Sequence, residues 1–253
     1  MERLHGKVAV VTGSGKGIGE AIAKRFAKEG AYVVVNARTA ENVDRVVNEI
    51  NAVCSGKAVG CAGDVSKKED AERVINTAIK EFGKLDVLVN NAGFGKDNLL
   101  VNMTEEEFDQ VIAVNLKGAF LCTQFAAKIM IQQKSGRIIN VTSRAGLRGN
   151  VGQVNYSSAK AALIGFTKTC ALELGRRYGI TVNAIAPAAW TDMTRNVPEK
   201  VKPIMIDNRV LARMADLDEN PDEITGIFVL FASDEGGYIT GQVISVDGGG
   251  LGL

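Results

Sequence analysis

The stretch KVAVVTGSGKGIGEAIAKRFAKEG, residues 7–30, decides the fold of this chain. It begins with a short apolar run of mostly β-branched residues, which predicts a buried strand. A glycine-rich turn follows, and after it apolar residues recur at helical spacing as far as Gly30. A glycine motif between a strand and a helix is typical of dinucleotide binding. On this segment alone, an ordinary structural loop remains the alternative interpretation.

The glycines of the turn have separate uses in such a site. Gly13 allows a positive φ, whereas Gly17 and Gly19 remove side chains where a pyrophosphate and the helix approach the strand. The N-terminus of the helix then presents free N–H groups to the phosphates. We therefore expect a dinucleotide to lie across this turn.

The end of the second predicted strand, AYVVVNAR at 31–38, indicates which dinucleotide is bound. An NAD site has an acid near this point for the ribose 2′-hydroxyl, but here the residues are Asn36, Ala37 and Arg38. Lys16 and Arg38 could flank a 2′-phosphate from two sides with charge-assisted hydrogen bonds. We infer NADP (NADPH) rather than NAD. The alternative is that both cations are solvated surface residues.

Strands and helices alternate along the rest of the chain. Further strands are predicted at 57–63, 85–93, 135–143, 180–187 and within 238–250, and further helices over 40–54, 66–83, 104–130 and 155–177 and from Pro221 onward. The pairs Ser66 with Glu69 and Thr104 with Glu107 have capping-box spacing at two of the helix starts.

This alternation defines an α/β fold class. We predict a single Rossmann-type dinucleotide-binding domain over 1–253 that contains the catalytic site, with a doubly wound parallel sheet of about seven strands and helices on both faces. Residues 188–220 lack a clean period and contain two prolines. A long irregular segment of this kind is expected to cover the substrate.

Composition argues against several classes of function. The formal net charge of +1 gives no basic field for nucleic acid or an anionic membrane. The segment MERLHGKVAVVTG has no long apolar region, so we expect neither a signal peptide nor a membrane span, and a cytoplasmic location. His5 is the only histidine and lies in a polar lead-in, so a histidine-based triad or metal site is not expected. Four cysteines without CxxC spacing fit reduced, buried thiols: Cys54, Cys61, Cys122 and Cys170.

NYSSAK, residues 155–160, places Tyr156 and Lys160 one turn apart on one face of a predicted helix. Such a pair is common on surface helices and indicates nothing by itself. In an active site the ammonium would favour the phenolate and lower the pKa of the tyrosine from its ordinary value near 10. Ser143 follows the fifth predicted strand, where an open parallel sheet binds its ligands. Asn115 lies in an apolar helix, where a buried amide needs partners, and we expect a functional distortion of the helix there.

These motifs resemble the short-chain dehydrogenase/reductase family. They occur in the family's order and spacing from Gly6 to Gly249, including thirteen residues from Ser143 to Tyr156. The motifs that carry the resemblance are TGSGKGIG at 12–19, NNAG at 90–93, Asn115, Ser143, Tyr156 and Lys160.

The resemblance implies a role for each catalytic position. Tyr156 would donate or accept the proton and Ser143 would hydrogen-bond the substrate oxygen. Lys160 would bind the nicotinamide ribose and Asn115 would hold a water in a proton relay; no metal is required. The resemblance also implies these cofactor contacts: Gly13, Gly17 and Gly19 at the pyrophosphate, Asp64 and Val65 at the adenine, Asn91 with its neighbours Ala92 and Gly93 along the ribose, Lys160 at the nicotinamide ribose, and Thr191 near the carboxamide. Besides Lys16 and Arg38, inferred above from their charge, we also expect Ser14, Ile18, Tyr156 and Pro187 to contact the cofactor.

Within the family, the likeness is to 3-ketoacyl reductases that act on acyl-carrier-protein or coenzyme A thioesters. We expect NADPH-dependent reduction of such a ketone to a secondary alcohol, in fatty acid metabolism. The family usually has Pro-Gly after the sixth strand, but Pro187 is followed here by Ala188. This departure is similar to hydroxyacyl-coenzyme A dehydrogenase domains, so the acyl carrier stays open.

Other interpretations remain at this stage. One is a dehydrogenase of a free secondary alcohol, cyclic or xenobiotic, and another is a non-catalytic dinucleotide-binding sensor or scaffold. Arg144 and Arg148 border the predicted pocket and would meet a carboxylate or a pantetheine phosphate, or are solvated loop residues. The family typically forms tetramers, and the apolar helices at 104–130 and 155–177 offer surfaces to bury, so we expect a homotetramer.

Overall fold

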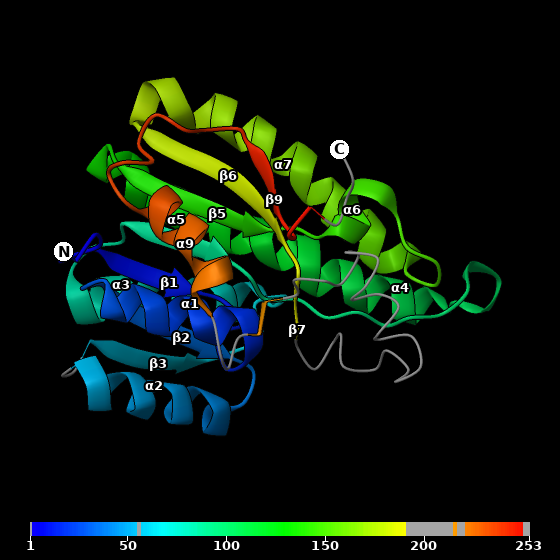
Figure 1. Cartoon of the computed structure of the whole chain (residues 1–253), viewed down its shortest axis with the longest axis horizontal. Helices are drawn as coiled ribbons and strands as arrows, with labels where there is room; N and C mark the ends of the chain where they lie inside the picture. The colour runs from blue at the N-terminus through cyan, green and yellow to red at the C-terminus, as the bar shows by residue number, and fades with distance from the viewer. Residues whose placement is uncertain (1, 55–56, 191–214, 217–220, 250–253) are drawn as a thin grey trace.

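Parallel strands form the central sheet in the order β3-β2-β1-β4-β5-β6-β9 (Figure 1). The computed structural model of the chain describes residues 2–54, 57–190, 215–216 and 221–249. Every neighbouring pair in the sheet is parallel. The strands are β1 (Val8–Val11), β2 (Tyr32–Ala37), β3 (Ala58–Ala62), β4 (Val87–Asn90), β5 (Gly136–Val141), β6 (Ile180–Pro187) and β9 (Val243–Val246).

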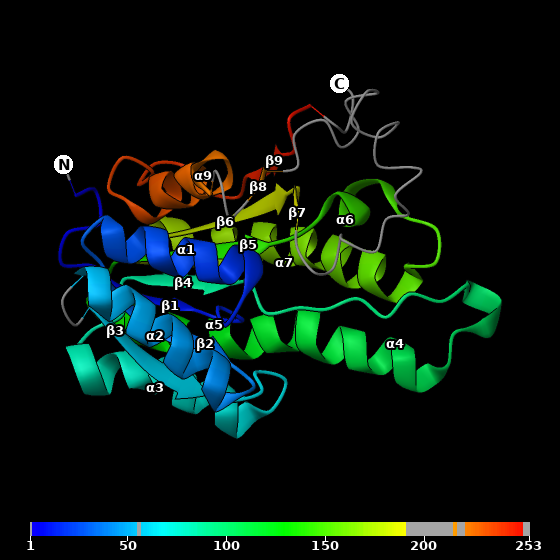
Figure 2. The same cartoon turned by 60° about the horizontal axis from the view of Figure 1, so that its bottom comes forward.

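Helices cover both faces of this sheet (Figure 2). They are α1 (Gly17–Lys28), α2 (Ala40–Cys54), α3 (Lys68–Phe82), α4 (Glu105–Ile112), α5 (Gly118–Gln133), α6 (Arg144–Arg148), α7 (Val154–Tyr178) and α9 (Asp222–Ala232), with a 3-10 turn η1 (Leu100–Asn102) and a π-helical segment η2 (Ala113–Lys117). None of these helices is long and apolar enough to cross a membrane.

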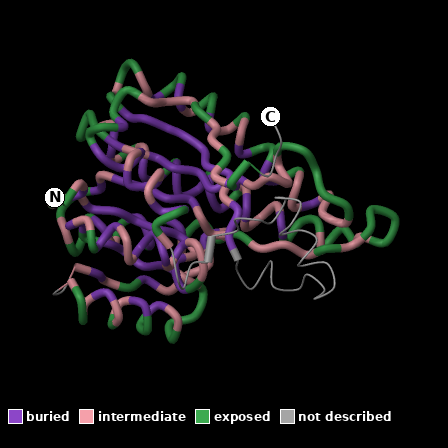
Figure 3. Tube along the Cα trace, viewed as in Figure 1, coloured by how far each residue is buried: buried purple, intermediate pink, exposed green. Residues whose placement is uncertain are grey.

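The sheet separates two apolar cores. Val8 and Val10 of β1 pack in the core that includes α3, α5 and α7, whereas Ala9 and Val11 pack in the core that includes α1, α2 and α9. Successive side chains of a strand point to opposite faces, so a strand buried on both faces is apolar throughout. Figure 3 shows the buried trace running through the centre of the sheet. The predicted α/β class with a seven-stranded parallel sheet is confirmed.

The strand order reverses between β1 and β4. The chain first runs outward from β1 to β2 and β3, then returns to place β4 on the other side of β1. In open α/β sheets the ligand binds in the crevice at such a switch point, beyond the carboxyl ends of the strands. The glycine turn follows β1 at this position, and residues 91–95 follow β4.

The structure contains one of the two predicted capping boxes. The capping box of Thr104 and Glu107 is present, with both reciprocal hydrogen bonds. The predicted capping box of Ser66 and Glu69 is wrong, because α3 begins at Lys68 after an N-cap residue, Lys67, whose side chain makes no capping hydrogen bond. The Ser66 hydroxyl instead donates to Asp64 Oδ1 at 2.8 Å.

The segment predicted to be irregular, 188–220, contains a short parallel pair of strands, β7 (Ala189–Trp190) and β8 (Ala215–Asp216). Residues 191–214 and 217–220, and with them Thr191, lie outside the described residues. All four cysteines are free thiols, but only Cys61 and Cys122 are buried, whereas Cys54 and Cys170 are half-buried.

Candidate active site

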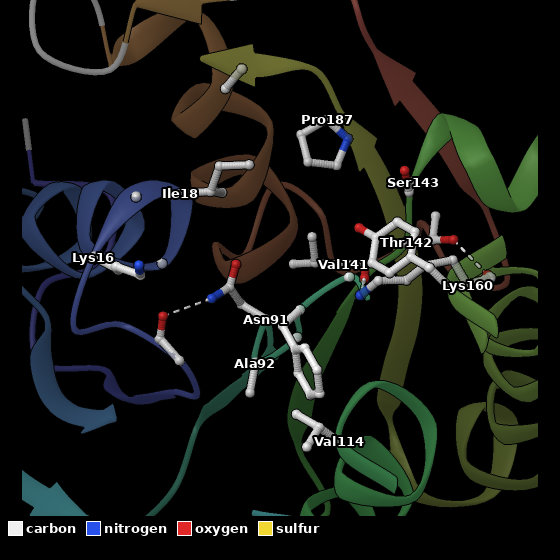
Figure 4. A pocket seen from close by; sticks show the side chains of 18 of the residues that line it. Lys16, Ile18, Asn91, Ala92, Val114, Val141, Thr142, Ser143, Lys160 and Pro187 are labelled. Atoms are coloured by element: carbon white, nitrogen blue, oxygen red, sulfur yellow. Dashed lines mark hydrogen bonds between the residues drawn. The ribbon is translucent and has the colours of Figure 1, made fainter. Parts of the chain in front are cut away.

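A cavity of about 1080 Å³ lies at the carboxyl ends of the strands, where β1, β4, β5 and β6 end. The glycine turn and the end of β2 form one end of its wall, and α6 and the start of α7 form the other. Figure 4 shows Lys16 and Ile18 on one side, Ser143 and Lys160 on the other, and Asn91 between them. Most of the sequence-predicted cofactor and catalytic positions therefore meet in one cavity.

The glycine turn packs closely against the residues that follow β4. A Cβ on Gly13 would lie 2.6 Å from the Ala92 Cα, and one on Gly19 would lie 2.5 Å from the Gly13 carbonyl oxygen. Gly13 also has φ +64°. The Asn91 side-chain amide donates to the Thr12 and Gly13 carbonyls at 2.9 and 3.0 Å. The result is a backbone cradle in which an added side chain has no room.

Arg45 of α2 holds the outer side of the same turn, and sequence analysis missed it. Its Nη2 donates to the Gly15 carbonyl at 2.9 Å and to Glu20 Oε2 at 2.7 Å. Its Nη1 donates to Glu49 Oε1 at 2.8 Å. Hydrogen bonds with Glu20 and Glu49 raise the pKa of Arg45. The guanidinium thus joins α1, α2 and the turn.

The side chain of Asn36, at the end of β2, forms hydrogen bonds with the backbone around it. It is buried; its Oδ1 accepts from the Gly13 N–H at 3.3 Å, and its Nδ2 donates to the Cys61 and Gly63 carbonyls at 3.0 and 3.2 Å. Ala37 and the exposed Arg38 follow at the cavity wall. No carboxylate stands at this strand end, as the sequence predicts.

Ser143, Tyr156 and Lys160 come together at the end of β5 (Figure 4). Ser143 is the N-cap of α6, and its Oγ accepts from the Ala145 N–H at 3.2 Å. Tyr156 lies in the first turn of α7. Lys160 is 3% exposed, and its Nζ donates to the Val141 carbonyl at 2.8 Å and lies 5.6 Å from the centre of the Tyr156 ring.

The electrostatics of this group differ from the sequence-based expectation. Burial raises the pKa of Tyr156, a hydrogen bond with Ser143 opposes that rise, and Asp97 adds to it. Burial also lowers the pKa of Lys160 to about 8. The predicted lowering of the tyrosine pKa by Lys160 is therefore wrong for the protein without cofactor. Burial disfavours the charged form of both groups, the ammonium of Lys160 and the phenolate of Tyr156.

Asn115 lies behind the cavity wall, in the π-helical segment η2, so the predicted helix distortion is present. Its Nδ2 donates to the Phe94 and Val111 carbonyls, both at 2.9 Å. Its Oδ1 is buried and has no hydrogen-bond partner among the described residues. A Cβ on Gly93 would lie 2.4 Å from that oxygen, so only glycine fits there. An orphaned buried acceptor of this kind fits a bound water.

Asn155 was not predicted as a site residue, although it belongs to the quoted motif. It is fully buried, its Oδ1 accepts from the Tyr156 N–H at 2.7 Å, and its Nδ2 donates to the Lys96 carbonyl at 2.9 Å. It therefore ties the start of α7 to the loop after β4. Asn155 lies in the first turn of α7, which begins at Val154 after the N-cap residue Gln153, so no local capping signal indicated this role.

Most predicted site residues line the cavity: Gly13, Lys16, Gly17, Ile18, Gly19, Arg38, Asp64, Val65, Asn91, Ala92, Gly93, Ser143, Tyr156, Lys160 and Pro187. Ser14 is buried beneath the turn, where its hydroxyl donates to the Val11 carbonyl at 2.7 Å. Lining residues that sequence analysis did not select as site residues include Gly15, Thr39, Asn42, Phe94, Val114 and Gln153. The described residues contain no cluster of three or more metal-ligating side chains.

Comparison with known proteins agrees with this geometry. Residues 7–202 match the model of the short chain dehydrogenase family, and the chain belongs to that family. The fold and the site thus define an oxidoreductase.

Particular relatives align over nearly the whole chain. It is 44% identical to a 3-oxoacyl-(acyl-carrier-protein) reductase of Thermotoga maritima and 47% identical to one of Synechocystis, each over 98% of both chains. It is 40% identical, over 97% of both chains, to a (2S)-[(R)-hydroxy(phenyl)methyl]succinyl-CoA dehydrogenase subunit of Thauera aromatica. Among solved structures, a Sinorhizobium meliloti protein described as a short-chain alcohol dehydrogenase has a TM-score of 0.91 at 36% identity, covering 99% of this chain and 98% of its own.

Proposed function

We propose that this protein is an NADPH-dependent reductase that converts a 3-oxoacyl thioester to its secondary alcohol. The observation that carries the proposal is the placement of Ser143, Tyr156 and Lys160 across one cavity from the glycine turn. The names of the similar proteins add the substrate class, because they name acyl groups on acyl-carrier protein or coenzyme A. The proposal leaves the carrier open.

The cavity residues fit a dinucleotide, because the glycine cradle leaves backbone room where a Cβ would collide. When bound, NADPH supplies the hydride. Gly13, Gly17 and Gly19 would hold the pyrophosphate, and Lys16 and Arg38 the 2′-phosphate. The other proposed contacts are Ser14 and Ile18 at the turn, Asp64 and Val65 at the adenine, Asn91, Ala92 and Gly93 along the ribose, and Pro187 and Thr191 near the carboxamide.

The protein's own groups would handle the proton. Ser143 would donate a hydrogen bond to the substrate carbonyl oxygen, on which negative charge grows. Tyr156 would give its phenolic proton to that oxygen, and its raised pKa keeps the phenol protonated near neutral pH, which suits reduction. Lys160 Nζ would use donors not taken by Val141 to hold the nicotinamide ribose. Asn115 would hold a water for proton return through its unpartnered Oδ1.

Replacing Tyr156 with phenylalanine tests the catalytic assignment. We expect Tyr156→Phe to lower kcat for acetoacetyl-coenzyme A by roughly 100-fold or more, since a positioned general acid contributes about that factor. The dissociation constant for NADPH, measured by fluorescence titration, should stay within a few-fold of the wild-type value. Unchanged turnover would refute the assignment, and faster turnover of small cyclic ketones than of any thioester would favour the free-alcohol dehydrogenase.

The cofactor assignment has its own test. We expect Lys16→Gln/Arg38→Gln to lower kcat/KM for NADPH by roughly 10- to 100-fold, because charge-assisted hydrogen bonds to the 2′-phosphate are lost. NADH lacks that phosphate and serves as the matched control, so its kcat/KM should hardly change. A wild-type enzyme that oxidised NADH faster than NADPH with every ketone would contradict the assignment.

The proposal extends to the organisation of the protein. We propose one domain over residues 1–253, a cytoplasmic location, and a homotetramer. Large apolar side chains exposed on α5 and α7, namely Phe120 and Leu172, support burial of these helices between copies. The segment 188–220, proposed to cover the substrate, lies mostly outside the described residues.

A further inference from the structure

The short helix α6 is held in one orientation beside the catalytic residues. It begins directly after its N-cap, Ser143. A Cβ on Gly146 would lie 2.6 Å from the Lys160 carbonyl carbon and 2.8 Å from the Lys160 Cβ. Because no side chain fits in this contact, the Gly146 face of α6 packs flush against α7. The rotation of α6 about its own axis is thereby fixed.

Two arginines occupy another face of α6, toward the cavity. Arg144 and Arg148 are four residues apart, so they lie one above the other, and both line the cavity wall. Like charges at this spacing destabilise a helix. Burial and repulsion from Arg148 lower the pKa of Arg144. The pair therefore opposes the stability of the short helix that carries it.

The acids at this end of the cavity include Asp97, which acts on Tyr156 and accepts from Gln153 Nε2 at 2.9 Å, and Asp247. Asp247 attracts Arg144, and its Oδ1 accepts from the Gly249 N–H at 3.1 Å. Among the described residues, Arg148 forms no salt bridge with an acid. Asp64 is the one acid among the described lining residues, and it follows β3, with β2, β1 and β4 between it and β5. Lys160 adds positive charge at the same end.

We propose that Arg144 and Arg148 bind a carboxylate on the acyl chain of the substrate, so that the enzyme prefers 3-oxoacyl thioesters whose chain ends in a second, free carboxylate. This inference rests on the proposed function and names its substrate class. A guanidinium pairs with a carboxylate through two parallel hydrogen bonds. One helical turn advances only about 5.4 Å, so the bound anion lies a few carbon atoms from the carbonyl held by Ser143. A carrier phosphate would be separated from that carbonyl by the whole pantetheine arm.

The test compares two substrates that differ in one charge and carry no phosphate. They are the N-acetylcysteamine thioester of 3-oxoadipate with a free terminal carboxylate, and the same thioester with that carboxylate methylated. We expect wild-type kcat/KM to favour the free acid by roughly 10- to 100-fold. Arg148→Gln should bring the ratio close to one, Arg148→Lys should keep part of it, and Arg148→Glu should favour the methyl ester.

Arg176→Gln is the matched control, because Arg176 is exposed on the last turn of α7 and does not line the cavity. It should keep the wild-type ratio. If Arg148→Gln also keeps that ratio, the inference is overturned. It is equally overturned if Arg148→Gln lowers kcat/KM only for acetoacetyl-coenzyme A, which would assign the arginines to a carrier phosphate. Failure of the wild-type enzyme to reduce either thioester would instead count against the proposed function.

Discussion

Lys160 is a buried ammonium group, and its burial destabilises the charged form in the protein without cofactor. Burial lowers its pKa from 10.5 to about 8. Between those two values the unfolded chain binds more protons than the folded chain, so the free energy of unfolding rises with pH. The penalty is fully present below about pH 8 and is relieved as the pH approaches 10.5.

We therefore expect the difference in unfolding free energy between wild type and Lys160→Met to increase with pH. From pH 7.5 to 9.5 the change should be about 2 kcal/mol in favour of wild type. Urea unfolding at both pH values, without cofactor, measures it. Subtracting the Lys160→Met values removes the titration of the groups that do not interact with Lys160. A difference that stays flat would mean that Lys160 titrates normally in the folded protein.

At the scale of single residues, spacing predicted which side chains meet but not their pKa shifts or all of their hydrogen-bond partners. Ser143, Tyr156 and Lys160 could be selected because strand ends and helical turns fix their positions. The direction of the Tyr156 pKa shift could not, since it depends on burial by segments distant in the sequence. Asn155 was missed for a similar reason, because its partners Lys96 and Glu107 belong to α4 and the loop before it.

At the scale of elements, Arg45 connects α1, α2 and the glycine turn. The ion pairs of Arg45, which is 43% exposed, lie near the surface, where such pairs contribute about 0–1 kcal/mol to stability, so loss of its pairs with Glu20 and Glu49 should hardly affect folding. Its hydrogen bond to the Gly15 carbonyl instead positions the turn. We expect Arg45→Met to raise the dissociation constant for NADPH by roughly 3- to 10-fold while the melting temperature changes little.

Lys24→Met is the matched control, because Lys24 pairs with the same two acids, Glu20 and Glu49, through 2.5 and 2.6 Å contacts. Among the described residues, Lys24 forms no hydrogen bond with the glycine turn. NADPH binding, followed by fluorescence titration, should therefore weaken in Arg45→Met and not in Lys24→Met. Equal weakening in both variants would show that the ion pairs, rather than the contact with Gly15, position the turn.

Element boundaries illustrate what local signals can and cannot decide. Thr104 and Glu107 form their capping box, and the Glu107 carboxylate also accepts a hydrogen bond from the Asn98 side chain at 3.1 Å. Ser66 fails as a cap because Asp64 accepts both its N–H and its hydroxyl, so the helix begins two residues later. A distortion of the helix at Asn115 was predicted from an amide in an apolar helix, which needs hydrogen-bond partners, and the structure has a π-helical segment there.

At the scale of the whole molecule, the alternation of strands and helices predicted the parallel sheet. The right-handed crossover rule leaves few ways to connect such a chain, and β1 with its glycine turn fixes the switch point. Residues 188–220 could not be predicted in the same way, because no hydrophobic period specifies a partner surface there. The short β7–β8 pair depends on contact between segments 26 residues apart, at Ala189 and Ala215, rather than on local pattern.

The proposed tetramer can be tested on the exposed apolar side chains of α5 and α7. Phe120 is 44% exposed and Leu172 is 85% exposed, and the two helices contact each other on the same face of the sheet. Burying a side chain of this size contributes about 1.5–3 kcal/mol, and a symmetric assembly repeats that contribution in every copy.

We expect Phe120→Lys/Leu172→Lys to reduce the sedimentation coefficient from that of a tetramer to that of a dimer or monomer, because charged side chains resist burial. Val53→Lys is the matched control, since Val53 is 82% exposed on α2, on the opposite face of the sheet. It should sediment as wild type does. A tetramer that survives the double substitution would place the interface elsewhere. A monomeric wild-type protein would refute the proposed assembly, and the apolar side chains of α5 and α7 would then have no subunit packed against them.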